Sequence, residues 1–501
     1  MSETGAIRRI VIVGGGTAGW MAAAALSKFV GGSGRRIVLV ESEAIGTVGV
    51  GEGTIPPILE YNLQLGIDEG EFLRETHAAY KLGIEFDGWT GVGERYFHQF
   101  GHIGRPLNGV PLYQLWLRHR RDPSVGQLAD YSMSAVAAAR HRFGYPAQDP
   151  TDPLSQIAYA FHFDATAYGK FLRRYAEAHG AERIEGRIVG VDQDGESGFV
   201  TAVRLEDDRK VRGDLFIDCS GFRSLLLGAA LGVPFEDWSH WLPCDRAVTV
   251  GSERTEPLLP YTRSTAHSAG WQWRIPLQHR TGNGHVYCSA HMDDDEAERI
   301  LLDTLDSPPI AEPRRLRFTA GRRAKSWEAN VVAIGLSSGF LEPLESTSIH
   351  LIQHGIQKLL SLFPGQPISP VERDEYNRFM AASYEPTRDF IILHYFANRR
   401  DEAFWRRMRD MPLPDTLRHK IELFREHGRV FRYNDELFDM PSWVAVMLGQ
   451  CIVPAEADPL AAALPQAEVL RAMAELRRAY VGAAERLPLS SDFIAARMAA
   501  A

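Results

Sequence analysis

The stretch Gly14-Gly15-Gly16-Thr17-Ala18-Gly19-Trp20 decides how the chain begins to fold. An apolar run, residues 10–13, precedes it, and an Ala-rich run that favours a helix, residues 21–29, follows it. A GxGxxG pattern between a strand and a helix is typical of a turn that binds a dinucleotide. In this interpretation Gly14 permits the tight turn, Gly16 lets the backbone approach a pyrophosphate, and Gly19 lets the helix pack against its strand.

The residues around this turn strengthen the prediction of a nucleotide site. The N–H groups of Thr17 and Ala18 begin the helix, whose positive dipole end attracts phosphate. A second apolar strand, residues 37–40, ends in Glu41, the expected distance for an acid that binds a ribose hydroxyl. A Gly-rich turn in an unrelated α/β protein is the alternative, and the strand, the helix and Glu41 together disfavour it.

Composition narrows the class of protein. The 501 residues are too many for one simple core, and 45% hydrophobic with 24% charged residues is ordinary for a soluble protein. A net charge of −9 argues against nucleic acid or an anionic membrane as the main partner. No signal peptide or membrane span is evident, and Cys219, Cys244, Cys288 and Cys451 are scattered. We expect reduced thiols, no metal site and a cytoplasmic protein.

The order of expected elements indicates an α/β protein that becomes helical towards its C-terminus. The Gly-rich loop 47–56 follows the second strand, and a strand is expected over residues 80–86. A helix opened by Asp164 as N-cap should lead to further strands, one of which, residues 214–221, should return to the nucleotide sheet. Another buried strand is expected at 330–335, with a helix from about residue 349 and helices beyond residue 366, separated by proline-containing breaks at 412–414, 441 and 454.

Five further motifs give the sequence a family resemblance. They are TVGVGEGTIP at 47–56, YKLG around Lys81, FHQFG at 97–101, WQWRIP at 271–276 and EPLESTS at 342–348, in addition to GGGTAGW at 14–20. In this order, over about the first 350 residues, the sequence resembles the flavin-dependent tryptophan halogenases. GxGxxG is common to many flavoproteins, whereas WxWxIP together with the lysine is far more specific.

The resemblance implies a fold and a division of the chain. The fold would be α/β, with a Rossmann-like FAD-binding module of the GR2 flavoprotein-monooxygenase type and a mainly helical C-terminal module. We expect residues 1–365 to form the FAD module, with an aromatic-rich insert at about 88–153, and residues 366–501 to cover the substrate. The cofactor-binding residues would be Gly14, Gly16, Thr17, Ala18, Gly19, Glu41, Val50, Gly335 and Leu344.

The resemblance also implies a reaction. Reduced FAD and oxygen would convert a bound halide into hypohalous acid, which reaches a lysine that delivers the halogen to an electron-rich aromatic carbon. Lys81 matches that lysine and Glu345 the carboxylate near it. Hypohalous acid is poorly selective, so a positioned donor is needed. A desolvated lysine and a carboxylate that takes up the ring proton suit this chemistry. Taken alone, Lys81 is better explained as a surface lysine on a strand and Glu345 as a residue at a helix start, and only the surrounding motifs reverse this.

Further residues match three kinds of position in the family: those that separate the substrate from the flavin, those that pack against the substrate ring, and those that bind the halide. Trp271 and Trp273, two apart on a strand, share a face and would separate the substrate from the flavin, although a core aromatic pair would pack in the same way. His98 and Phe100 match an aromatic pair against the substrate ring, and a satisfied core histidine is the alternative for His98. The halide would bind backbone N–H groups at Thr347 and Ser348. Because Ser348 replaces the usual glycine, we expect bromide to be favoured over chloride.

The C-terminal region departs most from the family pattern. Enzymes of the family that act on free tryptophan hold its amino and carboxylate groups with a Tyr pair, a Glu and an Asn around an anchoring Trp. With Trp443 as the anchor, the Glu position is Phe438, the Asn position is Met447, and the Tyr pair falls on Phe431 and Arg432. Apolar side chains cannot pair with a zwitterion. The sequence therefore predicts an indole-type aromatic rather than free tryptophan, although Tyr433 and Glu436 lie close enough for a shifted alignment to restore the usual groups.

Three functions follow as hypotheses. The first is an FAD-dependent halogenase that receives reduced FAD from a separate flavin reductase, because no second dinucleotide fingerprint is present for NAD(P)H. The second is a flavin-dependent aromatic monooxygenase, which the Trp271/Trp273 wall disfavours and which gives Lys81 no role. The third is a flavin-binding protein without turnover. The oligomeric state stays open, with a homodimer as one arrangement.

Overall fold

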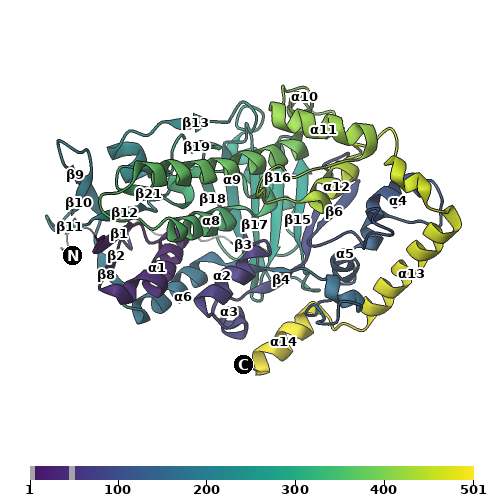
Figure 1. Ribbon diagram of the computed structural model, residues 1–501, viewed down its shortest axis with the longest axis horizontal. Coiled ribbons are helices and arrows are strands. Elements are labelled where there is room, and N and C mark those ends of the chain that lie inside the picture. Colours follow the sequence, from purple (N-terminus) through teal and green to yellow (C-terminus); the bar gives the residue numbers. More distant parts are fainter. Residues whose placement is uncertain (1–5, 45–50, 501) are drawn as a thin grey trace.

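The computed structural model describes residues 6–44 and 51–500 and contains two large sheets (Figure 1). The first sheet is parallel except at the antiparallel edge strand β20. Its strands, in spatial order, are β20 (Trp327–Glu328), β21 (Val331–Ala333), β12 (Leu215–Asp218), β1 (Arg9–Val13), β2 (Arg36–Glu41) and β8 (Glu182–Glu185). The predicted return of residues 214–221 to the nucleotide sheet is confirmed, since β12 pairs with β1.

Helices cover this sheet because its strands are apolar on both faces. Residues Ile10–Val13 and Ile37–Val40 are almost fully buried, as expected for a central parallel sheet. Helix α1 (Thr17–Val30) packs against α6 (Ala165–Ala178) and α8 (Ser348–Ser361). Asp164 caps α6 as predicted, because its side chain accepts hydrogen bonds from the N–H groups of Thr166 and Ala167.

The second sheet has seven strands and carries the two tryptophans of WQWRIP. In spatial order they are β18 (Arg314–Arg317), β14 (Arg246–Glu253), β17 (Arg280–Tyr287), β16 (Gly270–Pro276), β15 (Thr262–His267), β5 (Gly83–Asp87) and β6 (Arg95–Gln99). Trp273 lies opposite Gly284 of the neighbouring strand β17. The missing side chain at Gly284 leaves the space that the Trp273 ring fills.

A small third sheet joins the two large ones and carries Lys81. It consists of β3 (Gly51–Gly53), β7 (Ala160–Asp164) and β4 (Ala79–Lys81). The prediction of a single strand over residues 80–86 is wrong, because this segment forms two strands, β4 and β5, that belong to different sheets. The chain changes sheet at Leu82, whose N–H donates to the carbonyl of Pro260 and whose carbonyl accepts from the N–H of Phe100, so that this residue already bonds to the segments that flank β5 in the second sheet.

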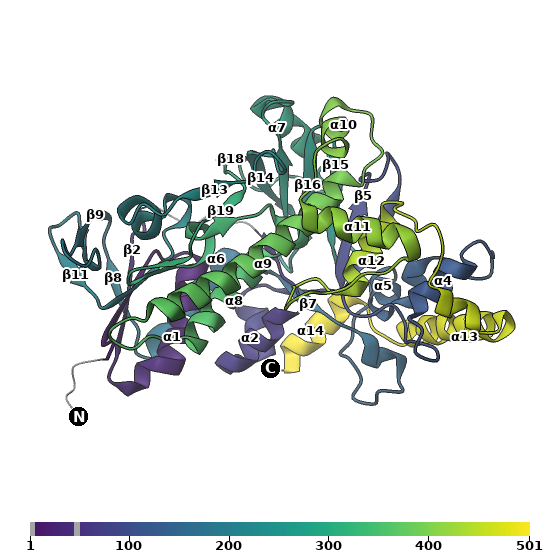
Figure 2. The same cartoon turned by 45° about the horizontal axis from the view of Figure 1, so that its top comes forward.

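The C-terminal third is helical, as expected. Figure 2 shows α9 (Pro370–Phe396) running across the molecule, and it contacts α8, β20 and the first three of the five helices that follow it. Those helices are α10 (Ala403–Arg409), α11 (Asp415–His427), α12 (Met440–Gly449), α13 (Gln466–Glu485) and α14 (Ser490–Ala500). The break expected at Pro441 is instead the first turn of α12, where a proline costs no hydrogen bond. No helix among the described residues is long and apolar enough to cross a membrane.

Smaller elements complete the fold. Two three-stranded sheets lie beside the large ones: β11 (Lys210–Arg212), β10 (Val200–Leu205) and β9 (Ile188–Gln193), and β13 (Phe235–Asp237), β19 (Gly321–Arg323) and β22 (Gly339–Phe340). The remaining α-helices are α2 (Pro57–Leu65), α3 (Glu69–Glu75), α4 (Leu112–His119), α5 (Met133–Ala138) and α7 (Asp294–Asp303).

The close fit of Trp273 against Gly284 gives a stability prediction. In Gly284→Ala the added carbon would lie 2.1 Å from the indole ring, so ring or strand must move. Such overpacking costs about 1–3 kcal/mol, and the thermal unfolding midpoint should fall. The control is Gly169→Ala in α6, where the new carbon meets no atom within 4 Å and alanine favours the helix. Equal midpoints for both variants would contradict this interpretation.

Candidate active site

The glycine turn before α1 has the shape that a pyrophosphate requires. Gly14 has φ +110°, and a side chain there would lie 2.3 Å from the Cys219 carbonyl oxygen. A side chain at Gly19 would lie 1.8 Å from the Gly14 carbonyl oxygen, whereas one at Gly16 would meet no atom within 4 Å. Gly16 caps α1 without a side-chain hydrogen bond, so the N–H groups of the first turn are available to an anion.

The other residues predicted to bind the cofactor are Glu41, Gly335, Leu344 and Val50. Glu41 ends β2, and its carboxylate accepts a hydrogen bond of 2.5 Å from Nε of Arg183 while covering Gly15. Gly335 has φ +76° and lies against Ala18 of α1, so that a side chain there would come within 2.8 Å of the Ala18 methyl group. Leu344 is buried. Val50 lies outside the described residues.

Lys81 has no exposed surface although its side chain ends in an amine. Nζ donates a hydrogen bond of 2.8 Å to Oγ of Ser346 and lies 5.3 Å from the ring centroid of Phe100. Gly53 of β3 leaves room for both groups, because a side chain there would come within 3.2 Å of Nζ. Burial lowers the pKa of Lys81 to about 7, against the opposing effect of the Glu345 charge. Neutral and charged amine are therefore both accessible near neutral pH.

Glu345 is equally buried and lies between two histidines. Nδ1 of His98 is 2.9 Å from Oε2 and 3.1 Å from Oε1, and Nε2 of His394 is 2.8 Å from Oε1. Burial by itself raises the pKa of a carboxyl group, but the two histidines outweigh it and lower the pKa of Glu345 to about 2. The group is therefore a carboxylate at any physiological pH.

The structure brings Lys81 and Glu345 to the same place without pairing them directly. They are separated by 264 positions in the chain and meet because Ser346, the neighbour of Glu345, bonds the lysine. Glu345 ends the 3₁₀ turn η7 (Pro343–Glu345), and Ser346 follows it with φ +58°, a strained value for serine. This turn directs Ser346 Oγ towards Lys81, while the Glu345 carboxylate contacts the histidines.

The two tryptophans of β16 form a buried pair. Their ring centroids are 5.9 Å apart, and both rings are at least 93% buried. Nε1 of Trp271 donates to Oε2 of Glu342 at 3.0 Å, and the hydroxyl of Tyr395 donates to the same oxygen. Burial raises the pKa of Glu342 to about 7. The bonded carboxyl group fixes the orientation of the Trp271 ring.

The start of α8 offers backbone N–H groups to an anion. Thr347 is the N-cap and Ser348 the first helical residue, and no hydrogen bond to either N–H occurs within residues 6–44 and 51–500. Ser348 is not among the described residues with positive φ, so serine fits here without backbone strain. A helix N-terminus of this kind binds a halide through N–H dipoles and the helix dipole.

An aromatic group closes the far side of His98. Phe438 stacks on Phe390 with centroids 3.9 Å apart and lies 6.2 Å from the His98 ring. Trp443 contacts the edge of Phe390 at 4.9 Å and is fully buried. Lys420 lies 5.1 Å from the Trp443 ring.

The ionic groups at this end of the site bind one another. Nζ of Lys420 lies 3.0 Å from Oε2 of Glu436 and donates to the Phe431 carbonyl at 2.7 Å. Glu436 also accepts a hydrogen bond from the N–H of Tyr433. Met447 is buried, whereas the side chain of Phe431 is exposed.

Several residues of the site carry no recognisable sequence signal. Ser346 lies inside the quoted motif EPLESTS without being singled out by it. His394 is the one histidine in the apolar run 390–396, and such a position is the only clue that it has a buried polar partner. Phe390, Tyr395 and Lys420 look like ordinary helix residues, and only tertiary contact gives them a place here.

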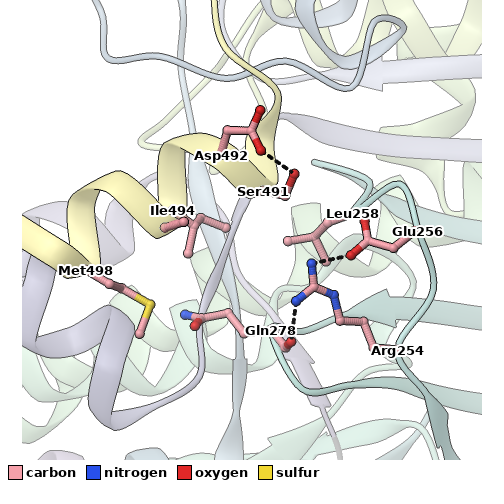
Figure 3. Close-up of a pocket in the computed structure, with 9 residues that line it drawn as sticks. Arg254, Glu256, Leu258, Gln278, Ser491, Asp492, Ile494 and Met498 are labelled. Atoms are coloured by element: carbon pink, nitrogen blue, oxygen red, sulfur yellow. Dashed lines mark hydrogen bonds and ion pairs between the residues drawn. The ribbon is translucent and has the colours of Figure 1, made fainter.

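A surface hollow elsewhere does not belong to this group. It lies between α14 and residues 254–258, and its lining, drawn in Figure 3, contains none of the predicted site residues. Arg254 at its edge is already paired with Glu256 and the carbonyl of Gln278. We therefore place the chemistry at the buried cluster around Lys81.

A dinucleotide turn on a parallel sheet, together with a buried amine on β4 and a buried carboxylate on η7, is typical of an α/β enzyme that binds a dinucleotide cofactor. A family model described as tryptophan halogenase matches residues 9–466. The flavin-dependent halogenase Xcc4156 from Xanthomonas campestris is 47% identical, with a TM-score of 0.94 over 98% of each chain. BrvH, a flavin-dependent halogenase from Brevundimonas sp. BAL3, has the same identity and TM-score over 98% of this chain and 99% of its own.

A curated relative is the 7-chloro-L-tryptophan 6-halogenase KtzR from Kutzneria sp. (strain 744), which is 40% identical over 83% of this chain and 84% of its own length. The chain therefore belongs to the tryptophan halogenase family and is a flavin-dependent halogenase, an oxidoreductase that uses FAD and a halide. The α/β fold and the family predicted from the sequence are both confirmed. The open turn at Gly16 and the unbonded N–H groups at α8 fit these two ligands.

The burial of Lys81 predicts how stability depends on pH. Its pKa is about 7 in the folded chain and about 10.4 when unfolded, so between these values the unfolded chain binds one more proton. Stability relative to Lys81→Met should therefore rise with pH, by about 2.7 kcal/mol between pH 7 and pH 9 at most. Urea unfolding of both proteins at pH 7, 8 and 9 measures this difference. A difference that does not change with pH would contradict the low pKa.

Proposed function

We propose that this halogenase delivers the halogen through Lys81 to an indole-type aromatic that lacks the amino-acid head of tryptophan. The observation that carries the proposal is the complete burial of Lys81, with Nζ bonded to Ser346 beside the Glu345 carboxylate. Only a buried amine of lowered pKa can act both as a hydrogen-bond donor and as an amine that takes up halogen near neutral pH. Neither a monooxygenase nor a flavin carrier needs such a group.

The bound groups would be held by the residues described above. We propose that the turn at Gly14–Gly19 holds the pyrophosphate of FAD, with Glu41 at the ribose and Gly335 and Leu344 along the cofactor. The N–H groups of Thr347 and Ser348 would hold the halide, bromide or chloride. Reduced FAD supplies the two electrons that activate oxygen for halide oxidation when it is bound, and we propose that a separate flavin reductase provides it.

The tryptophan pair and Lys81 would divide the site into two parts. Trp271, fixed by Glu342, and Trp273 keep an aromatic substrate away from the flavin, so that only a small oxidised halogen species crosses. Lys81 then orients this species, which sets the position of attack. The proposed division of the chain near residue 365 agrees with this, because Phe438 and Trp443 of the helical part close the substrate end.

The substrate class is supported by the apolar and already paired groups around Phe438. Phe438 and Met447 are buried where a zwitterion would need polar partners, and Lys420 and Glu436 bind each other. KtzR is named as a 7-chloro-L-tryptophan 6-halogenase, and SttH from Streptomyces toxytricini, 35% identical, as a tryptophan 6-halogenase. In this chain an ammonium and a carboxylate would be buried unpaired, at a cost of several kcal/mol each.

Removing the amine should abolish transfer to the ring. Lys81→Met should reduce bromination of indole by about 10²–10³-fold, the usual cost of losing one positioned donor. Formation of hypohalous acid, followed with a soluble 1,3-diketone trap, should persist because the halide site is intact. The bromination of indole is measured from the product mass after incubation with a flavin-reducing system and bromide. Lys325→Met, at the surface, is the control. Full activity of Lys81→Met, or an oxygenated product, would overturn the proposal.

A series of substrates tests the apolar end of the site. Indole and 3-methylindole should have kcat/KM values at least about 100-fold above that of free tryptophan, because two unpaired charges cost more than 2.8 kcal/mol. Tryptamine and indole-3-propionate, with one charge each, should fall between them. Efficient halogenation of tryptophan would keep the role of Lys81 and show instead that Glu436 exchanges Lys420 for the substrate ammonium.

A further inference from the structure

We propose that Lys420 makes this halogenase reject indoles that carry an ammonium group, because its own ammonium fills a cation site beside the substrate end. The site consists of the Glu436 carboxylate, the Phe431 carbonyl oxygen and the rings of Tyr433 and Trp443. The inference rests on the function proposed above and names the residue that sets its substrate class. Without Lys420 the site would take a primary ammonium on the side chain of an indole, as in tryptamine.

The Lys420 ammonium is surrounded by groups that recognise a cation. Nζ donates a hydrogen bond of 2.7 Å to the Phe431 carbonyl, and it lies 3.2 Å from Oε1 and 3.0 Å from Oε2 of Glu436. It also lies 4.6 Å from the ring centroid of Tyr433 and 5.1 Å from that of Trp443. Carboxylates, carbonyl oxygens and aromatic faces are the partners with which proteins bind ammonium ligands. The arrangement is therefore that of a cation site whose ligand is a side chain of the chain itself.

The partners of Lys420 are held in place by contacts that do not involve it. Lys420 belongs to α11, whereas the other members of the site come from residues 431–443, which follow that helix. Glu436 accepts a hydrogen bond of 3.2 Å from the N–H of Tyr433, and the Trp443 ring contacts the edge of Phe390 with centroids 4.9 Å apart. Loss of the Lys420 ammonium removes neither contact, so the site should keep its shape without it.

The cation site borders the aromatic groups that close the substrate end. Trp443 contacts Phe390, which stacks on Phe438 with centroids 3.9 Å apart, and Phe438 lies 6.2 Å from the His98 ring. Tyr433 is 55% exposed, whereas Trp443 is fully buried, so the site extends from the surface to these rings. An indole side chain that passes Phe438 towards Trp443 would end at the cation site.

Glu436 is the group that a substrate ammonium would need, and Lys420 already neutralises it. Both side chains are 95% buried. Oε2 of Glu436 is the oxygen nearer to Nζ, yet it makes no hydrogen bond within the described residues, so it can still accept one. Removing one partner of a buried ion pair leaves the other charge without compensation. Glu436 should therefore bind a substrate ammonium when Lys420 is absent, whereas a second ammonium beside Lys420 meets a like charge.

Other charged side chains of the same segment do not take over this role. Arg432 and Asp435 are exposed, so a substrate ammonium at Asp435 would remain in water. Exposed ion pairs contribute little to binding because water and salt screen them. Glu436 is thus the carboxylate of this segment whose burial would make a substrate ammonium bind strongly.

The first test asks whether the site binds a cation, without flavin or turnover. In Lys420→Ala the space of the lost side chain is open to a small ligand, so propylammonium should raise the unfolding midpoint of this variant, and propanol, of similar size, should not. The wild type and the double variant Lys420→Ala/Glu436→Gln should show no such shift. Equal effects of propylammonium and propanol on Lys420→Ala would overturn the proposal.

The second test measures substrate choice. Lys420→Met keeps the length of the side chain and loses its charge, so kcat/KM for tryptamine relative to indole should rise by about 10-fold or more. Adding Glu436→Gln to this variant should remove the gain, because the carboxylate that binds the ammonium is lost. The control is Lys358→Met, since Lys358 of α8 lies over the ring of Phe379 at 4.2 Å and is not part of the cation site.

The outcomes of the second test separate the two proposals. A wild type that halogenates tryptamine as efficiently as indole would contradict the proposed substrate class. A wild type that prefers indole, together with a folded Lys420→Met variant whose preference is unchanged, would overturn the role of Lys420 alone. If circular dichroism and the unfolding midpoint show that Lys420→Met does not fold, Lys420→Gln replaces it, because its amide carries no charge and can still donate to the Phe431 carbonyl.

Discussion

The removal of the Lys81 amine from water is the constraint on which the rest of the site depends. Burial of an ammonium is unfavourable, so the pKa of Lys81 falls to about 7, and within residues 6–44 and 51–500 the amine has the hydroxyl of Ser346 as its hydrogen-bond partner. Ser346 can reach it because its backbone takes a left-handed conformation after the turn η7. Gly53 leaves the space for both groups. Three segments that are far apart in the sequence thus exclude water from one amine and lower its pKa.

The same exclusion of water governs the carboxylates on either side. Glu345 is tolerated because two histidines from β6 and α9 contact its oxygens, and Glu342 because Trp271 and Tyr395 donate to it. One carboxylate therefore stays ionised beside the lysine, and the other orients the tryptophan pair. Helix α9 supplies a partner to each of them, His394 and Tyr395. The helical part of the chain is in this sense a component of the active site and not only its cover.

The elements that follow local rules were predictable. The glycine turn, its strands and the N-cap at Asp164 depend on residues within a few positions of one another, and the structure contains them where expected. The expected strand over residues 80–86 was wrong in one respect. It is divided at Leu82, because a hydrogen bond to Pro260, almost 180 residues away, directs the two halves to different sheets. No local pattern contains that information.

The sequence by itself determined the nucleotide-binding fold, the family and the candidates Lys81, Glu345, Trp271 and Trp273, since short motifs carry these signals. Only the tertiary structure decided what each group touches. It pairs Lys81 with Ser346, surrounds Glu345 with His98 and His394, and stacks Phe438 on Phe390. The physical reason is that burial and hydrogen bonding depend on residues hundreds of positions apart, and these contacts set protonation and thereby chemistry.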